Sequence, residues 1–299
     1  MSVASEWNPP EWLGRLDEGP DEVLWNLQGM RRGWQDYPGG MDFLDPDSPN
    51  YHWKAFQTRL YTEALGEALC LESDSALEVL DAACGIGRFL LPLARAGHSI
   101  LGVDACRPSL EAALRHLDAA VASEPELTDR VRLRWDDIDT TELPEEHFDL
   151  VLALELLCYL PEPDKTARRL ASTLRPGGRL ILSVEAWPGA LLSARDSLTP
   201  RELALACVER KLSLPGEYWV HPMEPDELAA ILDRVGLELL QLDGIHFFAD
   251  GPLADQVVLK QVGDPDYDRE LFGLEEALRA DPAFNGLSRA WLAVAQKRD

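Results

Sequence analysis

Apolar and polar positions follow two alternating periods along most of the chain. Short apolar runs typical of buried strands are separated by segments whose apolar residues recur every three or four positions, as they do in amphipathic helices. The predicted strands are 77–81, 99–104, 130–135, 148–154, 179–184, 237–242 and 290–296. The clearest predicted helices are 53–71, 88–96, 108–121, 164–174 and 226–235. This alternation predicts an α/β fold in which helices cover both faces of a mostly parallel sheet.

Two connections are longer than links between neighbouring elements usually are. Residues 185–222 follow the fifth predicted strand, and residues 243–289 separate the last two strands. Each contains a helical pattern of its own, at 201–212 and at 268–280. Ligands bind beyond the carboxyl ends of the strands in open α/β sheets. We therefore expect both insertions to form lids or walls of a substrate pocket.

Residues 1–53 form a segment of different composition, rich in aromatic side chains and in turn-forming proline and glycine. We interpret this segment as an N-terminal cap on a core of residues 54–299. Its aromatic side chains either enclose a substrate, anchor the cap, or form a dimer interface. The substrate contacts predicted within it are Trp34, Tyr37, Tyr51 and Trp53.

The charge balance narrows the choice of partner. The chain has 53 acidic and 28 basic residues, a formal net charge of −25, which disfavours binding to nucleic acids and anionic membranes. Its five cysteines lack the spacing of metal ligands and indicate a reducing compartment. The N-terminus has no signal-peptide pattern, and the longest apolar run is too short to span a bilayer. We expect a cytoplasmic monomer or homodimer that acts on a small molecule.

The strongest chemical signal is a glycine loop between two strands that end in acids. The first strand ends at Asp81 and is followed by Gly85-Ile86-Gly87, and the next strand ends at Asp104. Such a loop brings backbone N–H groups to a ligand, and the second acid is placed to bind a ribose. In a dinucleotide fold a third glycine would stand at position 90, which here is Leu90. Asp81 would repel a pyrophosphate, so it suits a ligand with a cationic amino-acid end.

The stretch from residue 80 to residue 110 resembles the nucleotide motif of the class I S-adenosylmethionine-dependent methyltransferases. The resemblance implies a Rossmann-like, seven-stranded sheet of order 3-2-1-4-5-7-6 whose last strand is antiparallel. It also implies S-adenosylmethionine as cofactor and S-adenosylhomocysteine as product. The cofactor-binding residues it implies are Asp81, Ala83, Cys84, Gly85, Gly87, Asp104, Ala105, Asp137, Ile138 and Glu155.

The resemblance continues beyond the glycine loop. By its spacing to Phe148, Asp137 matches the family acid that binds the adenine amino group, and Ile138 would offer its backbone N–H to the ring. The turn Pro176-Gly177-Gly178 resembles the family's entry into the fifth strand. One departure concerns the pair after Leu157, which is acid-histidine in the family and Cys158-Tyr159 here, so a histidine role at that position is in doubt.

We therefore predict a methyltransferase that acts on a small organic metabolite in bacterial secondary metabolism. Two alternatives stay open: an S-adenosylmethionine-binding enzyme that performs decarboxylation, hydroxylation or cyclisation, and a non-catalytic binding protein. Methyl transfer depends mainly on orientation and needs a base only where the acceptor must lose a proton. The sequence shows no metal-ligand cluster, and adenine recognition explains Asp136-Asp137 better than a cation does.

The candidate catalytic residues lie after strands or in the insertions. They are Glu155, Tyr159, His221 and His246. His221 can equally be a solvated loop histidine, His246 a pocket wall, and Glu155 a structural residue. Glu185 and Trp187 follow the fifth strand, so we expect them to contact the substrate.

Overall fold

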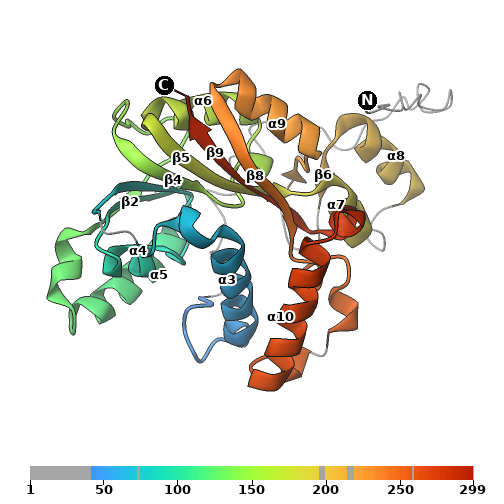
Figure 1. Cartoon of the computed structure of the whole chain (residues 1–299), viewed down its shortest axis with the longest axis horizontal. Coiled ribbons are helices and arrows are strands. Elements are labelled where there is room, and N and C mark those ends of the chain that lie inside the picture. Colours follow the sequence, from blue (N-terminus) through green and yellow to red (C-terminus); the bar gives the residue numbers. More distant parts are fainter. Residues whose placement is uncertain (1–41, 73–74, 195–198, 214–218, 258, 299) are drawn as a thin grey trace.

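A seven-stranded sheet crosses the molecule, with helices on both of its faces (Figure 1). The computed structural model describes residues 42–72, 75–194, 199–213, 219–257 and 259–298. The strands are β1 (Glu78–Ala82), β2 (Ser99–Asp104), β3 (Val131–Trp135), β4 (Phe148–Ala153), β5 (Leu174–Glu185), β6 (Leu212–Ser213), β7 (Trp219–Val220), β8 (Leu237–Ile245) and β9 (Ala290–Lys297). The helices are α3 (Tyr51–Leu65), α4 (Leu90–Arg95), α5 (Arg107–Val121), α6 (Pro163–Thr173), α7 (Trp187–Ser193), α8 (Pro200–Glu209), α9 (Pro225–Arg234) and α10 (Pro265–Arg279).

The strand order confirms the predicted topology. The sheet runs β3-β2-β1-β4-β5-β9-β8, while β6 and β7 pair separately as a short antiparallel sheet. Since β8 and β9 are therefore the sixth and seventh strands of the main sheet, the order is 3-2-1-4-5-7-6. β9 is antiparallel to both of its neighbours. Its amino end consequently lies at the edge where the other strands have their carboxyl ends.

The two sides of the sheet carry separate parts of the core, because successive side chains of a strand point to opposite faces. Leu80, Val151 and Leu182 pack with residues of α6 and α9. Val79 and Leu150 pack on the other side, with residues of α3, α4 and α5. The central strands are buried on both faces, which explains why they appear in the sequence as nearly continuous apolar runs.

Several element boundaries differ from those predicted. β5 already begins at Leu174, so the Pro176-Gly177-Gly178 turn lies inside its bounds, where the pairing with β4 shifts register. Gly177 adopts a left-handed backbone conformation there, with φ of 74°. β8 continues to Ile245, past its predicted end at residue 242. The predicted boundary between cap and core, at residue 53, falls inside α3.

Both insertions contain the helices that their patterns predict. The first holds α7, α8 and the β6–β7 pair, and the second holds α10. α10 packs against α3 through a small apolar cluster that includes Phe56, Leu60 and Leu271. In Figure 1, α3 and α10 extend from the same side of the sheet. The second insertion and the first described helix therefore form one packed unit below the sheet.

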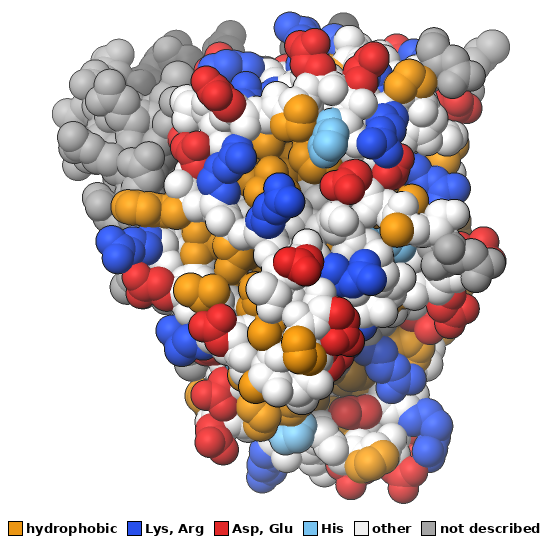
Figure 2. Space-filling model, turned by 90° about the vertical axis from the view of Figure 1, so that its left-hand side faces the viewer, with side chains coloured by type: hydrophobic (Ala, Val, Ile, Leu, Met, Phe, Trp, Pro, Cys, Tyr) orange, Lys and Arg blue, Asp and Glu red, His pale blue; other side chains and the backbone are white. Residues whose placement is uncertain are grey.

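Charged side chains of both signs are interspersed on the face shown in Figure 2. The excess negative charge is therefore distributed over that face rather than gathered in one patch. Among the helices of the described residues, none combines the length and the apolar character needed to cross a bilayer.

The packing of α7 predicts that Gly189→Ala destabilises the fold. A Cβ atom at the buried Gly189 would lie 1.9 Å from the carbonyl oxygen of Ser288. We expect an overpacking cost of about 1–3 kcal/mol in the free energy of unfolding, measured by urea denaturation. Gly273→Ala in α10 is the matched control, because nothing lies within 4 Å of its Cβ position. Helix propensity should make that variant about 0.5–1 kcal/mol more stable, and equal stability of both variants would contradict this packing.

Candidate cofactor and acceptor site

The loop between β1 and α4 is a chain of tight backbone turns. Ala83, Gly85 and Gly87 all have left-handed backbone conformations, with φ of 68°, 54° and 90°. The backbone N–H of Gly85 donates a hydrogen bond of 2.7 Å to the Asp104 carboxylate. Ala83 N–H donates to the carbonyl of Val103 at 2.8 Å. The glycine loop is therefore bonded to the end of β2, where the sequence places Asp104.

Asp104 is held in one orientation by backbone amides. Its Oδ2 accepts from Gly85 N–H, and its Oδ1 accepts from Cys106 N–H, also at 2.7 Å. Each carboxylate oxygen keeps further lone-pair capacity, so the group can still bind the two hydroxyls of a ribose. The Ala105 carbonyl accepts from the indole N–H of Trp135 at 2.9 Å. Trp135, 61% exposed, was not singled out in the sequence and braces this turn.

Asp81 is a buried carboxyl group whose charge is only partly offset by Arg88 among the residues described. Burial raises its pKa to about 7, the negative charge of Asp104 adds to the rise, and the positive charge of Arg88 opposes it. A cationic group bound beside Asp81 would favour the ionised carboxylate and lower that pKa again. The site thus fits a ligand with an ammonium group at this end.

The loop after β3 joins the same edge. Asp136 N–H donates to the Asp104 carbonyl at 3.1 Å, which places this loop beside the end of β2. Asp137 Oδ1 accepts from Asp139 N–H at 2.9 Å, and Ile138 is buried. The buried Asp139 carboxylate accepts a hydrogen bond from the Thr166 hydroxyl of α6. Asp81 in β1, Asp104 at the end of β2 and the loop after β3 therefore lie at one edge of the sheet.

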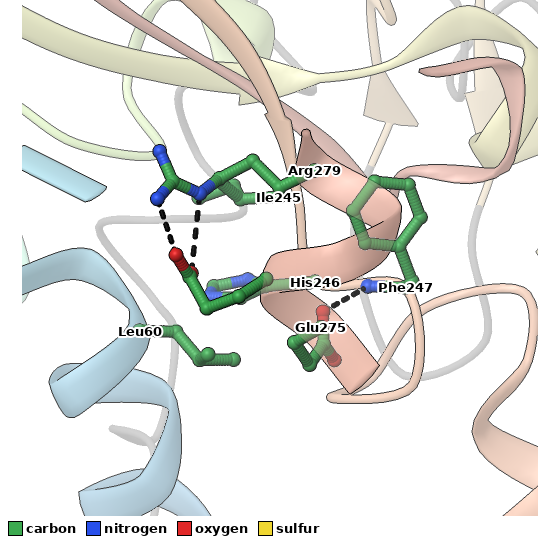
Figure 3. Close-up of a pocket in the computed structure, with 7 residues that line it drawn as sticks. Leu60, Ile245, His246, Phe247, Glu275 and Arg279 are labelled. Atoms are coloured by element: carbon green, nitrogen blue, oxygen red, sulfur yellow. Dashed lines mark hydrogen bonds and ion pairs between the residues drawn. The ribbon is translucent and has the colours of Figure 1, made fainter. Parts of the chain in front are cut away.

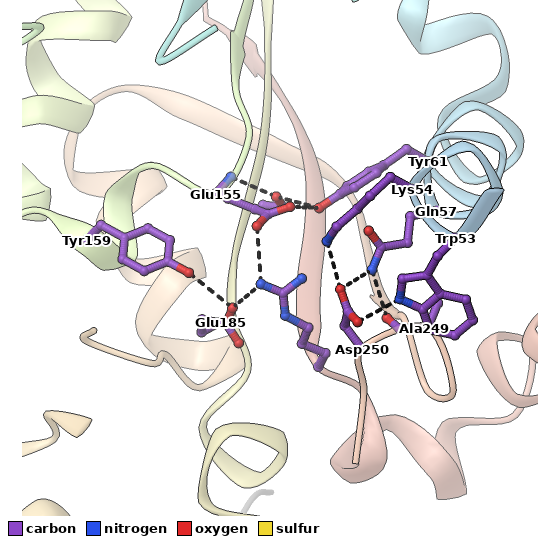
Figure 4. A network of polar contacts seen from close by, with 11 residues as sticks. Trp53, Lys54, Gln57, Tyr61, Glu155, Tyr159, Glu185, Ala249 and Asp250 are labelled. Atoms are coloured by element: carbon purple, nitrogen blue, oxygen red, sulfur yellow. Dashed lines mark hydrogen bonds and ion pairs between the residues drawn. The ribbon is translucent and has the colours of Figure 1, made fainter. Parts of the chain in front are cut away.

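A second polar cluster lies after β4 and β5 (Figure 4). Glu155 has a left-handed backbone conformation, with φ of 53°, and its N–H donates to the Ser183 hydroxyl oxygen at 2.9 Å. The Tyr61 hydroxyl, which comes from α3, donates to the Glu155 carboxylate at 3.1 Å. It also lies 3.1 Å from the Ser183 hydroxyl. Tyr61 is fully buried, and burial is the main cause that raises its pKa.

Arg289 stands at the centre of this cluster. Its buried guanidinium donates to Glu155 at 3.2 Å and to Glu185 at 2.8 Å. Tyr159 is also buried and donates to Glu185 at 3.4 Å. Burial alone would raise the pKa of Glu155, but the positive charges of Arg289 and Arg88 outweigh burial and lower it to about 2. Glu155 is therefore an anion throughout the physiological pH range.

His246 directly follows β8 and is 1% exposed. Its ring meets the Tyr61 ring edge to face, with 4.7 Å between ring centroids. Among the residues that the structure describes, neither ring nitrogen has a hydrogen-bond partner. Burial first, and then the charge of Arg289, lower the pKa of His246 to about 3, so the ring is neutral. It lines a small pocket with residues of α3 and α10 (Figure 3).

The remaining predicted site residues have other partners. His221 is partly exposed, and its Nε2 lies 3.1 Å from a carboxylate oxygen of Glu227. Trp187 is buried at the start of α7, with the Arg210 guanidinium 4.5 Å from its ring centroid. Trp53 is buried and donates to Asp250 at 2.7 Å, and Tyr51 begins α3. Trp34 and Tyr37 lie outside the described residues.

Three residues of the second cluster were absent from the candidates. They are Tyr61, Ser183 and Arg289. Arg289 could have been found from the predicted topology, since an antiparallel last strand begins at the edge where the others end. Tyr61 lies on the apolar face of a predicted helix, and nothing local distinguishes it from an ordinary core aromatic residue.

A sheet of this order, with a glycine loop and acids at the carboxyl ends of its strands, defines a class I methyltransferase fold. Residues 53–242, more than half of the chain, match the sequence model of a family described as "Methyltransferase domain". The chain belongs to this family, the class I S-adenosylmethionine-dependent methyltransferases, and S-adenosylmethionine is its cofactor.

Known proteins of this kind share both sequence and fold with the chain. Methyltransferase GfsG of Streptomyces halstedii is 33% identical over 187 residues, which cover 62% of this chain and 60% of GfsG. The chain thus spans less than two thirds of that relative. A ubiquinone biosynthesis O-methyltransferase of Nitrobacter winogradskyi is 28% identical over 195 residues, covering 64% of this chain and 67% of the relative.

Solved structures show the same fold at lower sequence identity. A putative S-adenosylmethionine-dependent methyltransferase of Listeria monocytogenes has a TM-score of 0.54 and 17% identity, over 81% of this chain and all of its own. These comparisons do not favour the predicted alternatives of non-methyl chemistry or non-catalytic binding.

The Arg289 cluster predicts that Arg289→Met is strongly destabilising. Removing the cation leaves the buried Glu185 and the partly exposed Glu155 without their guanidinium partner, which we expect to cost about 3–5 kcal/mol at pH 7 by urea denaturation. The unpaired carboxyl groups should have raised pKa values and take up protons as the pH falls, whereas Glu155 in the unaltered protein stays ionised down to about 2. The loss should therefore shrink at pH 5.

The double variant R289M/E185Q tests the same interaction at neutral pH. E185Q removes one of the two negative charges that Arg289 neutralises in the unaltered protein. The double variant should therefore recover part of the stability that R289M loses. A loss that is equal at both pH values and unaffected by E185Q would argue against the charge network.

Proposed function

We propose that this protein transfers the methyl group of S-adenosylmethionine to a hydroxyl group of a small organic metabolite. The observation that supports the proposal is a glycine loop bonded to Asp104, with the buried Asp81 beside it and Asp137 in the loop that joins the end of β2 through Asp136. A ribose diol, an ammonium group and an adenine amino group are three features of one cofactor, and each is matched by one of these acids.

The chain's own residues have distinct parts in cofactor binding. Asp104, oriented by two backbone amides, accepts from the ribose hydroxyls. Asp81 would face the ammonium group, and the Ala83–Gly87 loop, in which only Ala83 and Gly85 are partly exposed, would border the methionine moiety. Asp137 accepts from the adenine amino group, and Ile138 donates its N–H to the ring. Glu155 fixes the opposite wall through its bonds to Tyr61 and Arg289.

We assign His246 as the general base that takes a proton from the acceptor. The cofactor supplies an electrophilic methyl group on a positively charged sulfur. The neutral ring of His246 has a free lone pair, which can accept the proton that the hydroxyl must lose as its oxygen is methylated. Among the charges around His246, the Glu155 carboxylate favours the imidazolium that results, and it opposes burial and the positive charges of Arg289, Arg88 and Lys54, which together hold the pKa of the ring low. The positive charge lost from the sulfur is thereby replaced by one on the imidazole.

The metabolic setting is inferred from several observations of different kinds. The name of the O-methyltransferase relative supports an oxygen atom as the acceptor. A role in bacterial secondary metabolism remains our prediction. The five free cysteines support a reducing, cytoplasmic location, and the net charge of −25 disfavours nucleic-acid substrates. A monomer or homodimer remains our prediction for the oligomeric state.

Trideuteromethyl-labelled cofactor tests the proposed reaction. Incubation with a panel of phenols and hydroxylated metabolites should yield a product that carries the labelled methyl on oxygen, detected by mass spectrometry. His246→Gln should bind the cofactor normally in calorimetry but lose about 10²–10⁴-fold in rate. His147→Ala, an exposed histidine paired with Glu78, is the control and should keep its activity. Turnover of an acceptor without label in the product would refute methyl transfer.

The raised pKa of Asp81 predicts how cofactor binding depends on pH. The free carboxyl group has a pKa of about 7, and only its ionised form pairs with the ammonium group. Affinity should therefore fall about tenfold per pH unit below 7 and level off above it. Calorimetry in two buffers of different ionisation enthalpy should show proton release on binding. Asp81→Asn should remove the proton release, and retention of it would assign the titration to another group.

A further inference from the structure

We propose that Glu275 of α10 is a positioning residue that holds the segment 246–250 in the conformation that presents His246. This inference rests on the proposed role of His246. It concerns the insertion between the last two strands, a part of the chain that the cofactor site does not use.

One carboxylate satisfies three consecutive backbone donors of this segment. Glu275 Oε2 accepts from Phe247 N–H, and Oε1 accepts from Phe248 N–H and Ala249 N–H, each at 2.9 Å. Glu275 is 2% exposed, and all three bonds are at least partly buried. Figure 3 shows this carboxylate next to His246, with its bond to Phe247. Buried N–H groups without partners are costly, so the segment depends on this side chain.

Two residues in the left-handed region bound the segment. His246 has φ of 61° and Asp250 has φ of 62°, conformations that side-chain-bearing residues rarely adopt without outside support. At Gly251 the turn is so tight that a Cβ atom would lie 2.0 Å from the His246 carbonyl oxygen. The segment therefore needs restraints from its neighbours to keep this shape.

The other end of the segment is fixed to α3. The Asp250 carboxylate accepts from Trp53 at 2.7 Å, from Lys54 at 2.7 Å and from Gln57 at 2.6 Å (Figure 4). The His246 carbonyl accepts from Arg289 N–H at 3.0 Å. Glu275 thus restrains the middle of a segment whose two ends are already attached. Without it, the three middle N–H groups would turn toward water and His246 would turn with them.

Histidine NMR together with kinetics tests this role. In the unaltered protein the ring of His246, surrounded by Arg289, Glu155, Arg88 and Lys54, should stay neutral from pH 8 down to about pH 5, in keeping with its pKa of about 3. In Glu275→Ala the ring should reach water, and its pKa should move toward the ordinary 6.5. The kcat should fall about 10²-fold while the KM for S-adenosylmethionine stays unchanged.

Two further variants make the result specific. Glu275→Gln keeps one oxygen that can accept from Phe248 and Ala249, but its amide nitrogen cannot accept from Phe247. Its effects on the His246 pKa and on kcat should therefore be intermediate. If Glu275→Ala does not fold, this variant decides the question. Glu270→Gln changes an exposed carboxylate of the same helix that does not line the His246 pocket, and it should leave His246 neutral and kcat unchanged.

Unperturbed His246 resonances and a kcat within about twofold of the unaltered protein in a folded Glu275 variant would overturn the proposal. The titration of His246 does not require turnover. If the unaltered protein methylates no acceptor, the proposed function fails, while the NMR result still decides whether Glu275 positions His246.

Discussion

The buried guanidinium of Arg289 joins three strands at the sheet edge that carries the proposed site. It contacts Glu155 after β4 and Glu185 at the end of β5, and it stands directly before β9. A buried charge is tolerated only when it is paired, so each member of the group requires the others to be in place. Tyr61 extends this dependence to α3, because it donates to the same Glu155 carboxylate. This part of the proposed acceptor site is therefore held by charge pairing as well as by apolar packing.

The fold and the cofactor half of the site could be predicted because their signals are local. Each central strand is a short apolar run, and the Asp81–Asp104 motif lies within one strand–helix–strand unit. The structure joins these parts as expected, with Gly85 bonded to Asp104. The register of β5 was less predictable. A Pro-Gly-Gly sequence indicates a turn, but here tertiary pairing with β4 includes it within a strand.

The acceptor half of the site depends on contacts between distant parts of the sequence. Arg289 is 134 residues from Glu155 and 104 residues from Glu185, and Asp250 is 197 residues from Trp53. Periodicity and motifs do not report such pairings. Periodicity and motifs also gave no reason to choose His246 over His221 as the catalytic base. The two histidines differ in burial and in partners rather than in local sequence. Only the three-dimensional arrangement separates a neutral, buried ring from one paired with a surface carboxylate.

The hydrogen bonds around Glu155 have a direction that charge alone determines. An ionised carboxylate can only accept, so the Tyr61 hydroxyl gives its single proton to Glu155. The Tyr61 oxygen then accepts from the Ser183 hydroxyl, whose own oxygen accepts from the Glu155 N–H. The three bonds close into a ring in which every donor points the same way round, an arrangement in which each bond polarises the next. Glu155 contributes both its backbone N–H, as a donor, and its carboxylate, as an acceptor, to this ring of hydrogen bonds. The charge on its side chain therefore helps to hold its own backbone in the left-handed turn.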